Sequence, residues 1–243
     1  MYYLFKYVGM NGKDFLNSIS NQDFIKRDEL CLKYAIDNKT SLNNFKPIVI
    51  KEKGDELTYL VSNDYLSFDD VIVPLSANRA QKFMDEFYCT LPTKKMVDQI
   101  WQQAEIKVKQ FTKSPPYDAS MYSMREILKN SELIQQFLSN KTKDALLAGH
   151  KKDVVLTNKL SPNNPNKRVA IYGWHGLDGK PIQGPGVNAS SHERDFYYDY
   201  SHGIRIVSRD CTLNGKVLDI LEVLTSDKSY LLSDEGKLTF TKY

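Results

Sequence analysis

The sequence predicts a single-domain α+β fold, and three observations support this. The chain has 243 residues, enough to bury a core without a disulfide or a metal. Its 41% hydrophobic and 26% charged residues are ordinary for a globular protein. Helical apolar spacing dominates before about residue 150, and strand-like runs dominate after it. We therefore expect one domain over 1–243, with a helical lobe at about 78–148 and an antiparallel β lobe at about 150–236.

The N-terminal part is predicted to mix helices and strands. Residues 21–37 carry a rough apolar stripe, and Asp23 is a suitable N-cap for it. Residues 46–65 hold a buried run and an alternating run around a Gly-Asp-Glu turn, which predicts two strands. Residues 78–87 form a second helical stretch.

The clearest predicted helix covers residues 90–108. Thr90 or Thr93 can cap it, and the proline between them suits a first turn. A further helix is expected at 123–147, with Gly149 as its C-cap.

After residue 150 the pattern changes to strands and turns. Strands are predicted at 154–156, 168–174, 196–207 and 216–224, with a turn cluster at 160–167 and a Gly/Pro-rich loop at 176–191. Gly203, within one of these strands, predicts close approach of another backbone or a ligand.

Charge and hydropathy limit the classes of partner. The formal net charge is +3 and basic residues are scattered, so the Lys151-Lys152 and Lys167-Arg168 pairs are expected to be solvated and nucleic acid is not expected as a partner. No run approaches 18 apolar residues, so no membrane span is predicted. The N-terminus shows no signal-peptide pattern. The oligomeric state is not indicated.

All four histidines lie in one third of the chain, and a cysteine precedes the clearest predicted helix. The histidines are His150, His175, His192 and His202. Histidine titrates near neutral pH and ligates metals, so this third is predicted to carry the chemistry. Cys89 would sit at the helix N-terminus, where the dipole and free N–H groups stabilise a thiolate. Cys89 is therefore the candidate nucleophile, and a buried packing cysteine is the alternative.

His202 is the candidate general base for this thiol. It lies far downstream in the strand-like segment 200–207, and a cysteine on a helix followed by a histidine on a sheet is the order found in papain-like enzymes. Asp199 or Asp210 could orient the imidazole. His175, at a strand end beside a long loop, is a further catalytic candidate. A structural, hydrogen-bonded histidine is the alternative.

The same residues could hold a metal. Zinc accepts nitrogen and oxygen ligands, which His150, His175 and His202 supply together with His192 and Asp153. Their spacing matches no compact metal motif, and the cysteines form no CxxC pair. We expect no cofactor, with zinc as the alternative.

Five segments resemble a family of uncharacterised bacterial proteins. They are Cys89–Asp98 (CTLPTKKMVD), Gly149–Val155 (GHKKDVV), Val169–His175 (VAIYGWH), Lys180–Gln183 (KPIQ) and Asp199–Arg205 (DYSHGIR). Members are usually exported, so the resemblance implies an extracytoplasmic location. It also supports Cys89 as the nucleophile, and Trp174, Tyr200 and Arg205 within these motifs are expected to contact the substrate.

A second resemblance, to NlpC/P60 cell-wall cysteine peptidases, rests on 152–156, 168–172 and 178–183. It implies a papain-like (NlpC/P60-like) architecture and a peptidoglycan substrate. The catalytic histidine of that family would fall at Arg168, so the base would here be His202 or His175.

The leading hypothesis is a thiol-dependent hydrolase of an amide bond in a peptide or in peptidoglycan. Cys89 would attack, His202 would act as the base and Asp199 would orient it. A zinc-dependent hydrolase is one alternative. The other is a non-enzymatic cell-wall or carbohydrate-binding protein, suggested by the tyrosine-rich segment 196–200.

Overall fold

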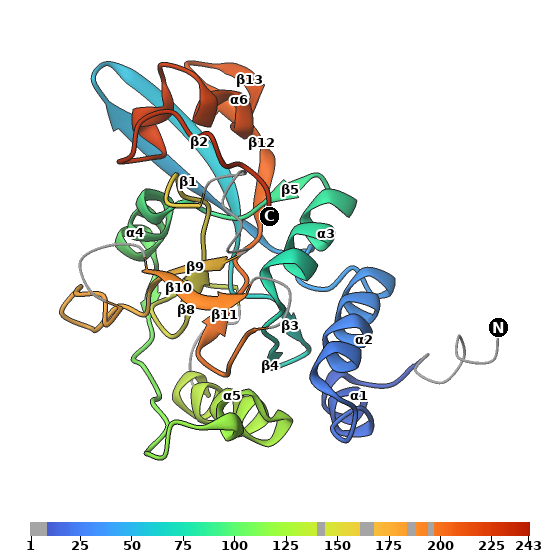
Figure 1. The fold of residues 1–243 in the computed structure, drawn as a ribbon. Coiled ribbons are helices and arrows are strands. Elements are labelled where there is room, and N and C mark those ends of the chain that lie inside the picture. The colour runs from blue at the N-terminus through green and yellow to red at the C-terminus, as the bar shows by residue number, and fades with distance from the viewer. Residues whose placement is uncertain (1–8, 140–143, 161–167, 184–187, 194–196) are drawn as a thin grey trace.

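Helices surround two β-sheets in the computed structural model of this chain, an α+β arrangement as the sequence predicts (Figure 1). The structure describes residues 9–139, 144–160, 168–183, 188–193 and 197–243, with 188–193 described by backbone alone. The predicted turn cluster at 160–167 lies almost wholly outside the described residues.

The larger sheet joins the first strands of the chain to the last ones. Its strands run in the order β1 (Phe45–Glu52), β2 (Asp55–Ser62), β12 (Val207–Leu213) and β13 (Lys216–Asp219), with β5 (Cys89–Thr90) also on β12. All of these pairs are antiparallel. The two strands expected within 46–65 are confirmed. The expectation of helices followed by a separate β half is wrong, because β2 from the N-terminal part pairs directly with β12.

The smaller sheet carries the segments that hold most of the predicted site. Its order is β10 (Asn188–Glu193), β9 (Arg168–Gly173), β8 (Lys152–Val154) and β11 (His202–Gly203). The pair β8–β11 is parallel, so the predicted all-antiparallel half is wrong. Strand β10 forms inside the expected Gly/Pro-rich loop because it pairs with the buried strand β9.

Gly203 makes the close approach that the sequence predicts. A Cβ atom at this position would lie 2.5 Å from the Tyr65 ring and 2.7 Å from the Cβ of Lys151. Two short ladders complete the strands: β3 (Ser67–Phe68) with β4 (Val71–Ile72), and β6 (Ile106–Lys107) with β7 (Leu147–Ala148).

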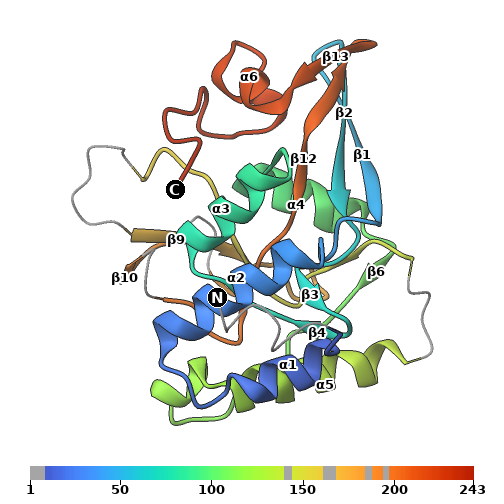
Figure 2. The ribbon, with the colours of Figure 1, turned by 90° about the vertical axis from the view of Figure 1, so that its right-hand side faces the viewer.

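Six α-helices pack around these sheets in the described part of the chain. They are α1 (Gly12–Ser18), α2 (Phe24–Asp37), α3 (Ala77–Glu86), α4 (Lys94–Gln103), α5 (Met124–Leu138) and α6 (Ile220–Thr225), joined by the 3-10 helices η1 (Ala119–Tyr122) and η2 (Ser229–Leu231). Figure 2 shows α2 beside α3, and α1 beside α5. The predicted caps Asp23 and Thr93 accept hydrogen bonds from the backbone N–H groups of Lys26 and Met96.

Several predicted boundaries are wrong. The helix expected at 90–108 covers only α4, and its first predicted residue lies in β5. The helix expected at 123–147 ends at Leu138, and Gly149 follows β7 instead of capping a helix. The strand expected at 216–224 turns into α6 after four residues, because Asp219 caps a helix there.

One hydrophobic core runs through both ends of the chain, from Phe15 to Phe240. The three cysteines are free and buried. Lys151, expected to be solvated, is fully buried. The single domain over 1–243 stays a prediction.

Candidate functional site

Each of the three histidines whose side chains are described lies beside its own aspartate. The Nε2 atom of His150 is 3.0 Å from Asp64 Oδ1, and the Nε2 atom of His175 is 3.0 Å from Asp98 Oδ1. For His202 the closest approach to Asp199 Oδ2 is 4.0 Å, longer than a hydrogen bond. The sequence pointed to Asp199 or Asp210 as the partner of His202. It missed Asp64 and Asp98, which come from distant segments of the chain.

The His202 pair is enclosed in the protein. Asp199 is 3% exposed and its Oδ1 accepts hydrogen bonds from the hydroxyl and the N–H of Ser201, while Tyr197 donates to its Oδ2. Burial opposes ionisation of Asp199, but the His202 charge and the Ser201 donors outweigh it and lower the pKa of this carboxyl. The carboxylate of Asp199 is therefore satisfied by donors from Ser201 and Tyr197.

The His175 pair connects α4 to the end of β9. Asp98 Oδ1 also accepts from the Tyr172 hydroxyl at 2.8 Å, and Lys94 donates to Oδ2 at 2.9 Å. The Trp101 ring stacks on the imidazole, with 5.5 Å between the ring centroids. His175 is 4% exposed. These contacts fix the imidazole between the helix and the sheet.

Cys89 does not sit at a helix N-terminus. It pairs with Ser208 in the larger sheet, and α4 begins five residues later at Lys94. The thiol donates to the Phe87 carbonyl at 3.3 Å. Burial, reinforced by the nearby Asp210, raises the pKa of the Cys89 thiol to about 11. The expected thiolate stabilisation by a helix dipole is therefore wrong, and Asp210 acts on this thiol instead of orienting a histidine.

The three residues expected to contact the substrate are buried. Trp174 donates from its indole to the His150 carbonyl, and the Tyr200 hydroxyl accepts from the N–H of Lys113. Arg205 is fully buried and donates to the backbone carbonyls of β2 and β7. Polar atoms of these three side chains thus form hydrogen bonds within the protein. Trp174 holds a backbone φ of +58°, a rare value for a bulky residue, between these contacts.

The structure also bears on the alternative metal ligands. In the described part of the chain, no group of three or more His, Cys, Asp or Glu side chains is placed to hold a metal ion. Asp153 instead accepts from the Tyr65 hydroxyl at 2.9 Å, and burial raises the pKa of this carboxyl to about 6. The side chain of His192 lies outside the described residues.

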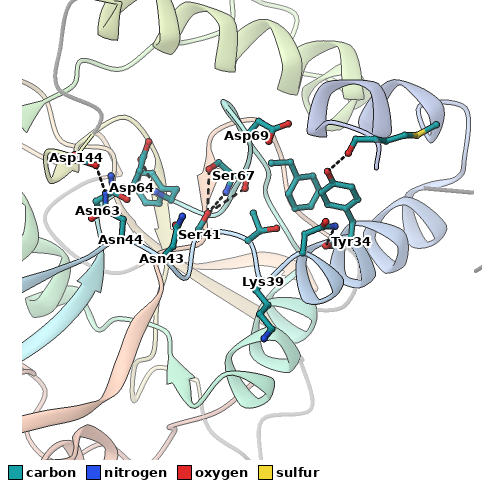
Figure 3. A pocket seen from close by; sticks show the side chains of 15 residues that line it. Tyr34, Lys39, Ser41, Asn43, Asn44, Asn63, Asp64, Ser67, Asp69 and Asp144 are labelled. Carbon is teal, nitrogen blue, oxygen red and sulfur yellow. Dashed lines mark hydrogen bonds between the residues drawn. The ribbon is translucent and has the colours of Figure 1, made fainter. Parts of the chain in front are cut away.

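A polar cavity of about 920 Å³ opens beside the His150 pair (Figure 3). Its lining comes from the end of α2, the segment before β1, the residues after β2, β3 and residue 144. Amide, hydroxyl and carboxylate groups dominate, and they include Asn38, Asn43, Asn44, Asn63, Ser41, Ser67, Asp64, Asp69 and Asp144, with Lys39 as a cation at the rim. The aromatic rings of Tyr34 and Phe68 also line the cavity but are at least nine-tenths buried.

Asp64 links this cavity to the buried histidine. Its Oδ1 accepts from His150 and from the N–H of Tyr65, the latter at 2.7 Å. Within the described residues no hydrogen bond reaches Oδ2, and the side chain is 18% exposed. Burial opposes ionisation of Asp64, but the charge and the hydrogen bond of His150, together with the Arg205 charge, outweigh it and lower the pKa of this carboxyl. Burial lowers the pKa of His150, against the attraction of the Asp64 carboxylate.

The sequence did carry a signal for this cavity. Ser62-Asn-Asp-Tyr65 ends a strand with two turn-forming polar residues, and such strand ends are common site positions. The cavity as a whole could not be predicted, because its other lining residues come from separate segments that only the fold brings together.

Comparison of the chain with protein-family models, with curated proteins and with solved structures gave no match. Among the described residues, no helix combines the length and the apolar character needed to cross a membrane.

Proposed function

We propose that this protein binds a saccharide in the polar cavity beside Asp64. The observation that carries the proposal is the cavity itself: about 920 Å³ of concave space with an ionised carboxylate whose Oδ2 lacks a hydrogen bond among the described residues. Ligand cavities of about 300–1,000 Å³ are usual for small molecules. This one is large enough for more than one sugar ring.

The chemistry of the lining favours a polyhydroxylated ligand. Side-chain amides both donate and accept, hydroxyls do the same, and carboxylates accept strongly. Sugar hydroxyls need this mixture, whereas a lipid or an aromatic ligand would need exposed apolar walls. Because Tyr34 and Phe68 are nearly covered, recognition would rest on hydrogen bonds more than on ring stacking.

The buried histidine supports this role for Asp64. The Nε2 atom of His150 bonds to Oδ1 and orients the carboxylate, leaving Oδ2 for the ligand. Hydrogen bonds to a charged group contribute about 1.5–3 kcal/mol each, so Asp64 is expected to be the strongest single contact.

The thiol hydrolase with papain-like architecture stays a prediction from the sequence. It would need the Cys89 thiol to become accessible and ionised, whereas it is buried with a raised pKa and lies on a different sheet from His202. A saccharide ligand requires no such change.

The test is calorimetric titration with β-1,4-linked oligomers of glucose and of N-acetylglucosamine. Asp64→Asn keeps the shape of the side chain but removes its charge, so we expect affinity to fall about ten- to a hundredfold. Asn44→Ala, at the opening of the cavity, should weaken binding without touching the buried His150 pair.

Two variants serve as controls. Asp227→Asn removes an exposed carboxylate that pairs with Lys237 outside the cavity. Cys89→Ala removes the thiol. Both should bind like the wild type, with unchanged circular dichroism. No binding of any oligomer by the wild type, or equal affinity of the Asp64→Asn variant, would refute the proposal.

A further inference from the structure

A second, smaller cavity adjoins the first one. Its volume is about 230 Å³, and Asn63, Asp64, Ser67 and Asp69 line both cavities. The shared residues lie in the segment that follows β2 and around β3, and Asp64 is one of them.

The far walls of the two cavities differ in chemistry. The larger cavity continues into amide and hydroxyl groups. The smaller one continues toward α5, β4 and β7. Its wall there combines three apolar residues with three polar ones: Leu138, Ile72 and Leu147, and Gln135, Asp70 and Ser139. The Gln135 amide nitrogen donates to the Asp70 carbonyl at 3.1 Å, which holds this side chain in place. This mixture of polar and apolar groups suits a ligand group that combines an amide with a methyl end.

The size of the smaller cavity indicates an extension of the larger one. A volume of 230 Å³ lies below the range of about 300–1,000 Å³ usual for independent small-molecule sites. It suits one further sugar unit or its substituent. Because the two cavities share Asp64, a chain bound in the larger one would extend past this carboxylate into the smaller one.

We propose that the two cavities form one groove, that its ligand is an oligosaccharide of N-acylated amino sugars, and that one N-acyl group occupies the smaller cavity. This proposal rests on saccharide binding at the larger cavity. The acyl methyl group would contact Leu138 and its apolar neighbours, and the amide would face Gln135.

The experiment measures affinity against chain length for oligomers of N-acetylglucosamine and of glucose, from one to five units. We expect the N-acetylated series to gain at least fivefold in affinity at one added unit, and the glucose series to lack this step. In the Leu138→Trp variant the indole ring fills the smaller cavity. The gain in affinity at the added unit should then disappear, while the shorter oligomers should bind as they do to the wild type.

Two further variants keep this test decisive. Leu177→Trp places the same ring at an exposed leucine that lines neither cavity, and it should keep the step. Gln135→Ala should weaken the step if the tryptophan variant does not fold. Short oligomers that bind without any gain with length, or a gain that survives in both Leu138→Trp and Gln135→Ala, would overturn the groove and leave saccharide binding standing. Absence of all binding would overturn both.

Discussion

Lys151 shows how one residue can couple the fold to pH. Its ammonium group is fully buried and donates to the Asn130 side chain at 2.7 Å and to the Tyr200 carbonyl at 2.5 Å. These bonds connect the start of the smaller sheet to α5 and to the segment before β11. Burial lowers the pKa of Lys151 to about 7, against the attraction of Asp199 and Asp64.

This burial predicts a pH dependence of stability. The folded chain releases the Lys151 proton near pH 7 and the unfolded chain near pH 10.5. The unfolded state therefore binds more protons in between, and the free energy of unfolding should rise with pH by up to about 1.4 kcal/mol per pH unit. We expect urea unfolding between pH 7 and 9 to show a steeper rise for the wild type than for Lys151→Met.

An exposed lysine provides the comparison. Lys216→Met, on β13, should keep the pH dependence of the wild type. Identical pH dependence in the wild type and in the Lys151→Met variant would show that the buried ammonium does not contribute this term.

At the scale of the element, α5 depends on the cap that begins it. The Ser123 hydroxyl accepts from the N–H of Glu126 at 3.2 Å, and the Ser-x-x-Glu spacing is that of a capping box. Ser123→Ala should lower the free energy of unfolding by about 0.5–2 kcal/mol. Ser123→Asp keeps an acceptor at the cap and should stay closer to the wild type in chemical denaturation. Equal losses in both variants would mean that the cap hydrogen bond is not the cause.

The short strand β5 explains why the predicted position of Cys89 at a helix N-terminus is wrong. Apolar spacing correctly located a helix after it, and Thr93 was one of the two caps named. The segment before this cap is short, so local signals did not show that residues 89–90 pair with β12. That pairing buries the thiol in a sheet and removes it from the helix dipole.

At the scale of the whole molecule, the larger sheet couples the two ends of the chain. Strand β2 pairs with β12 on one side. On its other side it pairs with β1 along the whole of β1, from Phe45 to Glu52. Helix α4 packs against both β1 and β9, so it contacts both sheets. The larger sheet thus joins the N-terminal part of the chain to its C-terminal part, and α4 connects it to the smaller sheet.

This architecture predicts one cooperative unfolding transition. Thermal or urea unfolding followed by far-ultraviolet circular dichroism and by tryptophan fluorescence should give coincident curves, because Trp101 on α4 and Trp174 after β9 report on the same core. Two separated transitions would instead indicate lobes that fold on their own.

The sequence by itself determined the α+β class, the strand pair around the Gly-Asp-Glu turn, the cap Asp23 of α2, Thr93 as one of two possible caps of α4, and the close approach at Gly203. These features follow from local periodicity, capping chemistry and backbone freedom, which neighbouring residues decide. Only the tertiary structure decided that β2 pairs with β12, that Lys151 is buried, and that Asp64 joins His150 to a polar cavity. Such contacts join residues far apart in the chain, and their burial and pKa shifts depend on packing that a linear pattern does not encode.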